Sequence, residues 1–297
     1  MSVNLPTHYV VSYSSNINIL LHEKGSKLRP FVMEGHYVGK QASPVDQFGP
    51  IEMQPVTSRF GPMGRVDAAT DRRWVFPSDF DLPQLIDTFD KLRLLTDPES
   101  TYVQNGVFAA GRQMDRLILL AALGTAKTGE AGATSTSFNA ANEIDVAVGG
   151  ANTRLNVAKL VAMQELMLAN SVDLEREMPV IPLTAKDNSA LLNEVQIISS
   201  DFNGGERPVL KDGRIMHFMG FDFVYCQLNE TVNAGTNECN IPTWVKSGMH
   251  LGIWNDVTTS ISKRNDLQGE PWQAYMYMTA GATRTEENKV YNFESFR

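Results

Sequence analysis

Residues 124–129, with the sequence GTAKTG, have the two-glycine spacing that begins a phosphate-binding loop. In such a loop a lysine and then a serine or threonine follow the second glycine, so that an ammonium contacts the phosphates and a hydroxyl binds Mg²⁺. Here Glu130 and Ala131 occupy those positions, and a carboxylate would repel phosphate. The segment also follows a helical pattern instead of a strand. We therefore interpret residues 124–150 as a flexible connector that includes a strand-like stretch, EIDVAVGG.

The histidines and cysteines do not form a recognisable metal or nucleophile motif. The five histidines show neither HxxxH nor HExxH spacing; they are His8, His22, His36, His217 and His250. His217 is interpreted as a hydrogen-bonded histidine within a strand. Cys226 and Cys239 lack CxxC spacing and are expected to be reduced thiols. A metal site assembled from residues distant in the sequence stays open, but no metal-binding residue is predicted.

Paired carboxylates could provide an acid and a base, and three pairs are considered for this role: Asp79 with Asp81, Asp87 with Asp90, and Glu175 with Glu177. Acid–base catalysis requires two carboxyl groups in different environments across a cleft, whereas sequence neighbours on a polar face are usually solvated. The chain also lacks a GxSxG nucleophile elbow and a GxGxxG dinucleotide fingerprint. The sequence predicts no catalytic residue, no cofactor-binding residue and no cofactor, and hence no enzyme.

The composition is that of a globular protein with an acidic surface. The chain has 297 residues, 42% hydrophobic and 20% charged, with a formal net charge of −8. The lysines and arginines form no block that would bind nucleic acid through a basic face. There is no signal-peptide pattern and no apolar run of the roughly 18 residues that a membrane span requires. We expect a soluble protein made in a reducing cytoplasm.

Several elements cannot bury their apolar sides alone. Tyr9, Tyr13, Ile17, Leu20 and Leu21 place one apolar stripe on an N-terminal helical arm. Residues 35–76 are poor in apolar side chains and contain two Gly-Pro pairs, which predicts a long, polar hairpin that projects from the body.

Two helices and a series of strands account for most of the remaining chain. A short helix is predicted over residues 81–95, and a second over 97–124 has an apolar stripe from Val103 to Ala121 and ends at Gly124. Another helix is predicted over 153–171. Strands follow, within residues 179–185, 194–199, 213–228, 250–264, 273–285 and 289–295, with a turn at 211–214. This order is α+β. The surplus of projecting elements predicts an assembly subunit and a large homo-oligomer.

This succession resembles the major capsid proteins of tailed phages, which have the Hong Kong 97-type coat fold. The segments KGSKLRPFV, EGHYVGK and QFGPIEM resemble the passage from an N-terminal arm into the extended E-loop. The segment DFDLPQLIDTFDKLRLLTDPESTYVQNGVFAAGRQMDRLILLAALGTA resembles the lead-in and spine helix of the peripheral domain. The resemblance implies an N-terminal arm (1–34), an E-loop (35–76), a peripheral domain with the spine helix (77–150), an axial domain (151–251) and return strands of the peripheral domain (252–297).

The resemblance also implies a function. The chain would self-assemble as pentamers and hexamers into an icosahedral head shell that encloses double-stranded DNA without sequence-specific binding. Scaffolding, portal and decoration proteins are the expected partners, with assembly in the host bacterial cytoplasm, localisation in the virion capsid and no membrane contact. Arg65, Arg72 and Arg73 would pair with acidic surfaces of neighbouring subunits, and a charge reversal at Arg72 and Arg73 would stop shell formation but leave the subunit folded. The alternatives are an encapsulin-type nanocompartment shell and an enzyme with a site not visible in the sequence.

Overall fold

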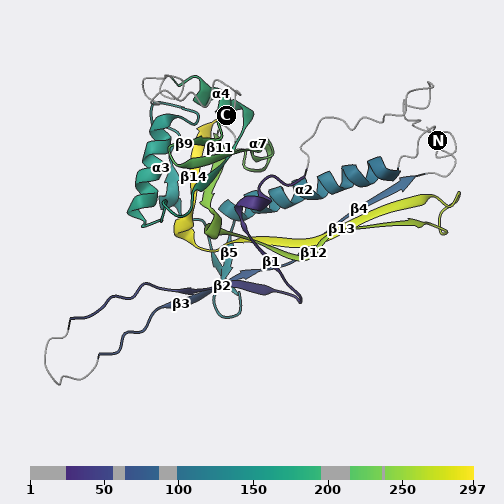
Figure 1. The fold of residues 1–297 in the computed structure, drawn as a ribbon, viewed down its shortest axis with the longest axis horizontal. Coiled ribbons are helices and arrows are strands. Elements are labelled where there is room, and N and C mark those ends of the chain that lie inside the picture. Colours follow the sequence, from purple (N-terminus) through teal and green to yellow (C-terminus); the bar gives the residue numbers. More distant parts are fainter. Residues whose placement is uncertain (1–24, 56–63, 87–98, 195–214, 236–237) are drawn as a thin grey trace.

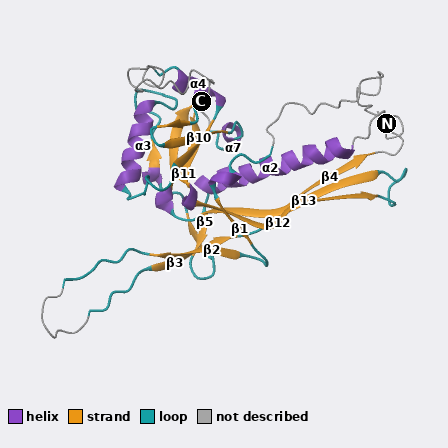
Figure 2. Ribbon diagram, in the orientation of Figure 1, coloured by secondary structure: helices purple, strands orange, loops and turns teal. Residues whose placement is uncertain are grey.

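The computed structural model describes residues 25–55, 64–86, 99–194, 215–235 and 238–297. Figure 1 shows three parts: a long helix lying along a long sheet, a second sheet with its own helices, and a hairpin that projects from the region where the sheets meet. Figure 2 shows that helices and strands alternate irregularly along these parts, so the predicted α+β class is confirmed. In the described part of the chain, no helix is both long and apolar enough to cross a membrane.

The first sheet has four strands in the order β1 (Met33–His36), β12 (Met249–Lys263), β13 (Trp272–Arg284) and β4 (Ser78–Ile86). β1 is parallel to β12, and the other neighbours are antiparallel. β12 and β13 form a long hairpin, as their alternating sequence predicted. This sheet supplies the elongated platform seen in Figure 1.

Helix α2 (Glu99–Leu123) lies along this sheet and, at about 1.5 Å per residue, is roughly 37 Å long. Its predicted end is confirmed, because Gly124 N donates to Leu120 O at 2.9 Å and β5 begins two residues later. Met114 and Ile118 of the predicted stripe are buried, whereas Val107 is 41% exposed. The chain segment 25–32, which contains a short 3₁₀ helix η2 (Arg29–Phe31), covers another side of α2.

The helix predicted over residues 81–95 is wrong for its first part, because residues 78–86 form strand β4. β4 pairs with β13 along its whole length, from Ala280↔Ser78 to Trp272↔Ile86. Phe80, Leu82 and Ile86 are less exposed than their neighbours in alternation, which is the period of a strand. Pro83 fits this assignment because β4 is at the sheet edge, where a missing backbone N–H costs no hydrogen bond. Residues 87–95 lie outside the described part.

The second sheet has six strands in the order β7 (Glu143–Ile144), β14 (Val290–Phe296), β11 (Glu238–Val245), β8 (Pro179–Leu183), β10 (Phe221–Tyr225) and β9 (His217–Phe218). The pairs β7–β14 and β8–β10 are parallel. The predicted helix over 153–171 is present as α3 (Val157–Ala169), whose Asn156 side chain accepts from Lys159 N. Two shorter helices, α4 (Ala185–Leu192) and α7 (Asn229–Val232), complete this part. The strand predicted at 194–199 and the turn at 211–214 fall almost wholly outside the described residues.

The prediction that residues 252–297 all return to the part containing the long helix is wrong for β14. β14 pairs with β11 from Glu238↔Phe296 to Trp244↔Val290 and so belongs to the six-stranded sheet. Val290, Tyr291, Asn292 and Phe293 are consecutive buried residues, so this strand needs cover on both faces. Tyr291 and Phe293 pack into the core around α3, whereas Val290 packs into a second core with Ile118, Trp244 and Leu251. Other members of the α3 core include Leu160, Met163, Met167, Ile181, Phe223 and Ile241.

A third, small sheet forms the base of the projecting hairpin. Its order is β2 (Ala42–Phe48), β3 (Thr70–Val75), β5 (Ala126–Thr128) and β6 (Thr134–Thr136), and all neighbours are antiparallel. The expected flexible connector is therefore wrong for residues 126–136, because β5 pairs with β3. Three further 3₁₀ helices lie near the sheet junction: η3 (Ala140–Asn142), η4 (Lys246–Gly248) and η5 (Glu287–Lys289).

Candidate interaction surfaces

The segment GTAKTG anchors the hairpin base and does not form a phosphate-binding loop. Lys127 Nζ donates to Ser135 Oγ at 2.8 Å within the β5–β6 pair. Gly129 O accepts a hydrogen bond from Trp74 Nε1 at 2.7 Å, and Gly129 N donates to Asp71 Oδ1 at 3.0 Å. The polar groups of the segment thus bind β3 and β6.

Two of the described histidines and both cysteines are paired with other side chains or buried within the fold. His217 lies in β9 and forms an ion pair with Asp222, which agrees with its interpretation as a partnered strand histidine. His250 is buried, its Nε2 lies 2.9 Å from Tyr37 Oη, and burial lowers its pKa to about 4. Cys226 and Cys239 are buried and form no disulfide, and burial raises the pKa of Cys239 to about 11. Within the residues that the structure describes, no group of three or more His, Cys, Asp or Glu side chains could hold a metal ion.

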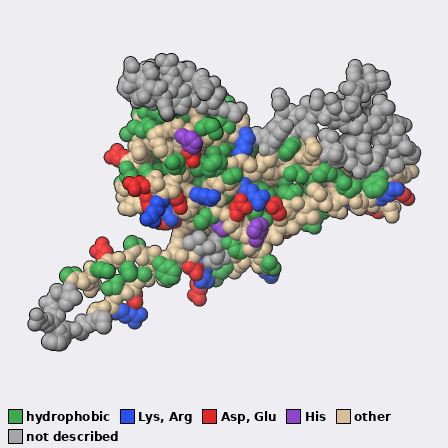
Figure 3. Space-filling model, viewed as in Figure 1, with side chains coloured by type: hydrophobic (Ala, Val, Ile, Leu, Met, Phe, Trp, Pro, Cys, Tyr) green, Lys and Arg blue, Asp and Glu red, His purple; other side chains and the backbone are tan. Residues whose placement is uncertain are grey.

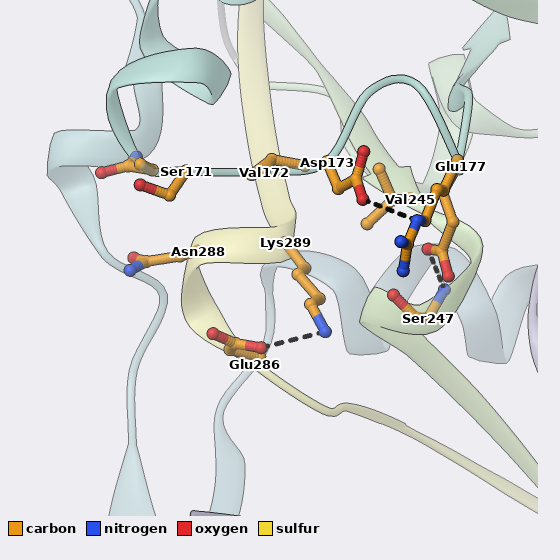
Figure 4. Close-up of a pocket in the computed structure, with 11 residues that line it drawn as sticks. Ser171, Val172, Asp173, Glu177, Val245, Ser247, Glu286, Asn288 and Lys289 are labelled. Carbon is orange, nitrogen blue, oxygen red and sulfur yellow. Dashed lines mark hydrogen bonds and ion pairs between the residues drawn. The ribbon is translucent and has the colours of Figure 1, made fainter. Parts of the chain in front are cut away.

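Two of the carboxylates singled out by their spacing, Asp79 and Glu177, have structural partners, and Asp87 and Asp90 lie outside the described residues. Asp79 accepts from the Thr279 hydroxyl at 2.7 Å. Glu177 accepts from Ser247 N at 3.1 Å at the rim of a pocket of about 290 Å³. Figure 4 shows this pocket, in which Lys289 reaches Glu286 and a second ion pair reaches Asp173. Both cations of this polar surface hollow are paired with carboxylates, and the third carboxylate, Glu177, accepts from a backbone N–H, so these contacts are structural.

The projecting hairpin presents apolar side chains to solvent. Phe48, Ile51 and Met53 are 75%, 64% and 100% exposed, and Val66, which precedes β3, is 46% exposed. Figure 3 shows hydrophobic side chains, in green, along the hairpin between its base and its grey tip. The expectation of a polar hairpin is therefore wrong. A thin two-stranded ribbon cannot cover such side chains itself, which marks it as an interaction surface.

The hairpin base is tied to the rest of the chain through buried charges. Arg73 of β3 is only 4% exposed and forms an ion pair with Glu287 of η5. Glu287 also lies 3.6 Å from Arg284, whose guanidinium donates to Ala122 O at 3.0 Å and to Gly124 O at 2.5 Å. These carbonyls belong to the C-terminal end of α2, where a cation is favoured.

The three hairpin arginines have ion-pair partners within this chain. Arg65 pairs with Asp67 and Arg72 with Asp46, all within this chain. Arg73 is buried, so reversing its charge would place a carboxylate beside Glu287 and destabilise the subunit. We therefore expect the charge reversal at Arg73 to destabilise the subunit, in contrast to the expectation drawn from the sequence.

A row of glycines lets the hairpin base cross the four-stranded sheet closely. Gly35 of β1, Gly252 of β12 and Gly281 of β13 are in register across three strands. A methyl group at Gly281 would lie 2.2 Å from the Phe76 carbonyl oxygen, and one at Gly252 would lie 3.2 Å from Val75. The absence of side chains at these positions allows the backbone after β3 to lie on the sheet.

The segment 25–32 is attached to α2 by a buried carboxylate. Asp115 is 0% exposed and accepts from Ser26 Oγ at 2.6 Å, Lys27 N at 2.9 Å and Leu28 N at 3.0 Å. Two backbone donors of the segment are thereby satisfied at one side chain. The start of the described chain is thus fixed near the middle of α2.

Comparisons with known proteins agree with this architecture. The family model described as "Phage capsid protein" matches residues 5–294, whereas no curated protein sequence matches. The chain is similar to the capsid structure of cyanophage Pam1 (TM-score 0.72, 13% identity, 100% of this chain and 99% of that chain). It is also similar to the capsids of cyanophage P-SCSP1u (0.71, 13%, 96% and 93%) and of Helicobacter pylori bacteriophage KHP30 (0.71, 10%, 99% and 96%).

The fold is therefore the Hong Kong 97-type fold of phage coat proteins, as the sequence resemblance implied. The family model matches almost the whole chain, from residue 5 to residue 294. The chain belongs to the phage capsid protein family. It is a structural component of the virion, the major capsid protein of a tailed-phage head shell, and not an enzyme.

Sequence reasoning missed most of the residues that attach the hairpin. Arg284, Glu287 and Asp115 occupy ordinary-looking positions in the sequence, and their partners are far away along the chain. Asp115 carries the one available signal, because helical spacing places it on the same face as Ile118, three residues later, whereas its charged neighbour Arg116 falls on the exposed side. A charge within such a stripe is expected to have a buried partner.

Proposed function

We propose that this chain assembles as pentamers and hexamers into a closed icosahedral shell around double-stranded DNA, with the projecting hairpin as a principal contact between copies. The observation that carries this proposal is the exposed apolar row on the hairpin, at Phe48, Ile51 and Met53. Burying such a side chain contributes about 1.5–3 kcal/mol. A second copy is the natural source of cover, because a capsid is built from many identical chains.

The parts of the fold suggest a division of roles within the subunit. The four-stranded sheet with α2 fits the peripheral domain, and the six-stranded sheet with α3 fits the axial domain near a symmetry axis. The hairpin fits the E-loop, and residues 25–34 fit the last part of the N-terminal arm expected over residues 1–34, of which residues 1–24 lie outside the described part. The boundaries expected at 77–150, 151–251 and 252–297 change in the last segment, because β14 belongs to the six-stranded sheet. The chain would then pass from the peripheral domain to the axial domain, return to the peripheral domain in β12 and β13, and end in the axial domain in β14.

The charge of the chain fits a container for DNA better than a DNA-binding protein. A net charge of −8 without a basic block gives weak attraction to phosphates, so packaged DNA would move freely along the inner wall. Scaffolding, portal and decoration proteins are proposed partners, and the host cytoplasm is the proposed place of assembly. The match to the phage capsid family favours this assignment over the encapsulin alternative.

Negative-stain electron microscopy of the expressed chain, with a scaffolding partner where one is needed, tests the proposal. We expect closed shells, or rings of five and six subunits. Replacing both Ile51 and Met53 by serine should abolish these assemblies without unfolding the subunit, because both side chains are exposed.

The matched control is Leu168→Ser on α3, a residue that is 57% exposed but lies outside the hairpin. This variant should assemble like the parent. A parent chain that stays monomeric or dimeric even with its partner would contradict the proposed function. Normal shells from the Ile51 and Met53 variant would contradict the role of the hairpin.

A further inference from the structure

The two direct connections between the large sheets meet at the base of the hairpin. One connection runs from β11 to β12 through η4, and the other runs from β13 to β14 through residues 285–289, here called the β13–β14 link. Thr285 joins the two connections, because its hydroxyl donates to Ser247 O at 2.6 Å and its N–H donates to Gly248 O at 2.9 Å. The relative orientation of the two sheets is thus set at this crossing.

Both strands of the hairpin base contact the β13–β14 link. From β2, the Gln47 side-chain amide donates to Thr285 O, and from β3 the Arg73 guanidinium donates to Glu287. A ribbon held by one strand could pivot about that contact. Attachment of both strands to the same short segment removes this freedom and defines the direction in which the hairpin leaves the body.

Charge makes Glu287 the central residue of this attachment. Arg73 and Arg284 are 4% and 0% exposed, and both lie beside the single carboxylate of Glu287. Burial and the neighbouring Arg73 charge lower the pKa of Arg284, whereas Glu287 opposes that effect. The α2 carbonyls partly balance Arg284, but Arg73 Nε and Nη1 have no hydrogen-bond partner among the described residues. The position of Arg73, and with it that of β3, therefore depends on Glu287.

We infer that Arg73 and Glu287 are positioning residues that couple the direction of the hairpin to the relative orientation of the two sheets. A change in that orientation moves the β13–β14 link, and the buried ion pair transmits the movement to the hairpin. Different subunit environments in a curved shell could then be accommodated by one correlated adjustment. The importance of the hairpin for assembly rests on the proposed function, but the coupling itself is a property of one chain.

The coupling can be measured as a distance within the full chain. We suggest spin labels at Met53→Cys on the hairpin and Leu168→Cys on α3, both exposed sites. Cys226 and Cys239 are buried, and a parent without the new cysteines measures their background labelling. Pulsed electron paramagnetic resonance on unassembled chain, diluted with unlabelled chain, should give one narrow distance population.

Glu287→Gln keeps the size of the side chain and removes its charge, so the narrow population should be lost and replaced by a broad one. Gln47→Ala is the milder second variant, which should also broaden the distribution if Glu287→Gln fails to fold. Asp46→Asn is the matched control, since it breaks the exposed Arg72–Asp46 pair in the same hairpin base without touching the β13–β14 link. This control should retain the narrow distance.

An unchanged distance distribution in folded Glu287→Gln or in Gln47→Ala would overturn the inference, even if the variants were less stable. Electron microscopy of the same variants separates this inference from the proposed function. A broadened hairpin distance with normal shells would support the coupling and contradict the importance of the hairpin in assembly.

Discussion

Replacing Gly281 by alanine should weaken the packing of the hairpin base against the four-stranded sheet. The new methyl group would lie 2.2 Å from Phe76 O and 3.1 Å from Phe76 C. Because non-bonded carbon and oxygen atoms make contact at about 3.3 Å or more, the Phe76 backbone must move by roughly 1 Å. Phe76 lies between β3 and β4, so the displacement affects both the hairpin base and the sheet edge.

The size of the effect follows from two opposing terms. Overpacking against backbone costs about 1–3 kcal/mol, whereas alanine restricts the unfolded chain and returns about 0.4–1 kcal/mol. We expect a net decrease of about 1–2 kcal/mol in the free energy of unfolding, or about 2–5 °C in Tm. Urea and thermal unfolding of the unassembled chain measure this directly.

Gly252→Ala provides the graded control in the same row. Its methyl group would first meet the Trp254 ring at 3.0 Å and Val75 Cγ1 at 3.2 Å, which are side-chain atoms that can shift. This variant should therefore lose less stability than Gly281→Ala. Equal or greater stability of Gly281→Ala relative to the parent, or a larger loss at Gly252, would refute the reasoning.

Two further predictions concern a buried histidine and a buried carboxylate. Burial lowers the pKa of His250 from 6.5 to about 4, so between these values the unfolded chain binds more protons and the free energy of unfolding falls as the pH is lowered. His250→Gln should flatten that dependence in urea titrations at several pH values, and an unchanged slope would argue against it. Asp115→Ala should cost about 1–3 kcal/mol and speed proteolysis near residues 25–32, because three donors lose their acceptor. The exposed Asp67→Ala is the control, and equal protease resistance in both variants would contradict the assignment.

The sequence by itself determined the elements whose residues repeat with a clear period. Helices α2 and α3 follow from apolar spacings of three and four, and the long strands β12 and β13 follow from alternation. The end of α2 at Gly124 was also predictable, since glycine is a poor helix residue and favours helix ends. The resemblance to coat proteins depended on the order of these same elements.

Residues 78–86 show where a local pattern was ambiguous. Leu82, Leu85 and Ile86 fit a helix face, but Phe80, Leu82 and Ile86 also fit one face of a strand. Pairing with β13 decided between them, because β4 gains a complete ladder of backbone hydrogen bonds there. Such a long-range partner leaves no signal within a short window of sequence.

Tertiary structure alone decided how the hairpin is attached. Arg73 meets Glu287 across 214 positions of sequence, and GTAKTG becomes part of the hairpin base only because β5 pairs with β3. Membership of β14 in the six-stranded sheet likewise depends on β11 and α3 being in place. Periodicity records which side of an element is buried, whereas the partner that buries it is set by the folded arrangement of the whole chain.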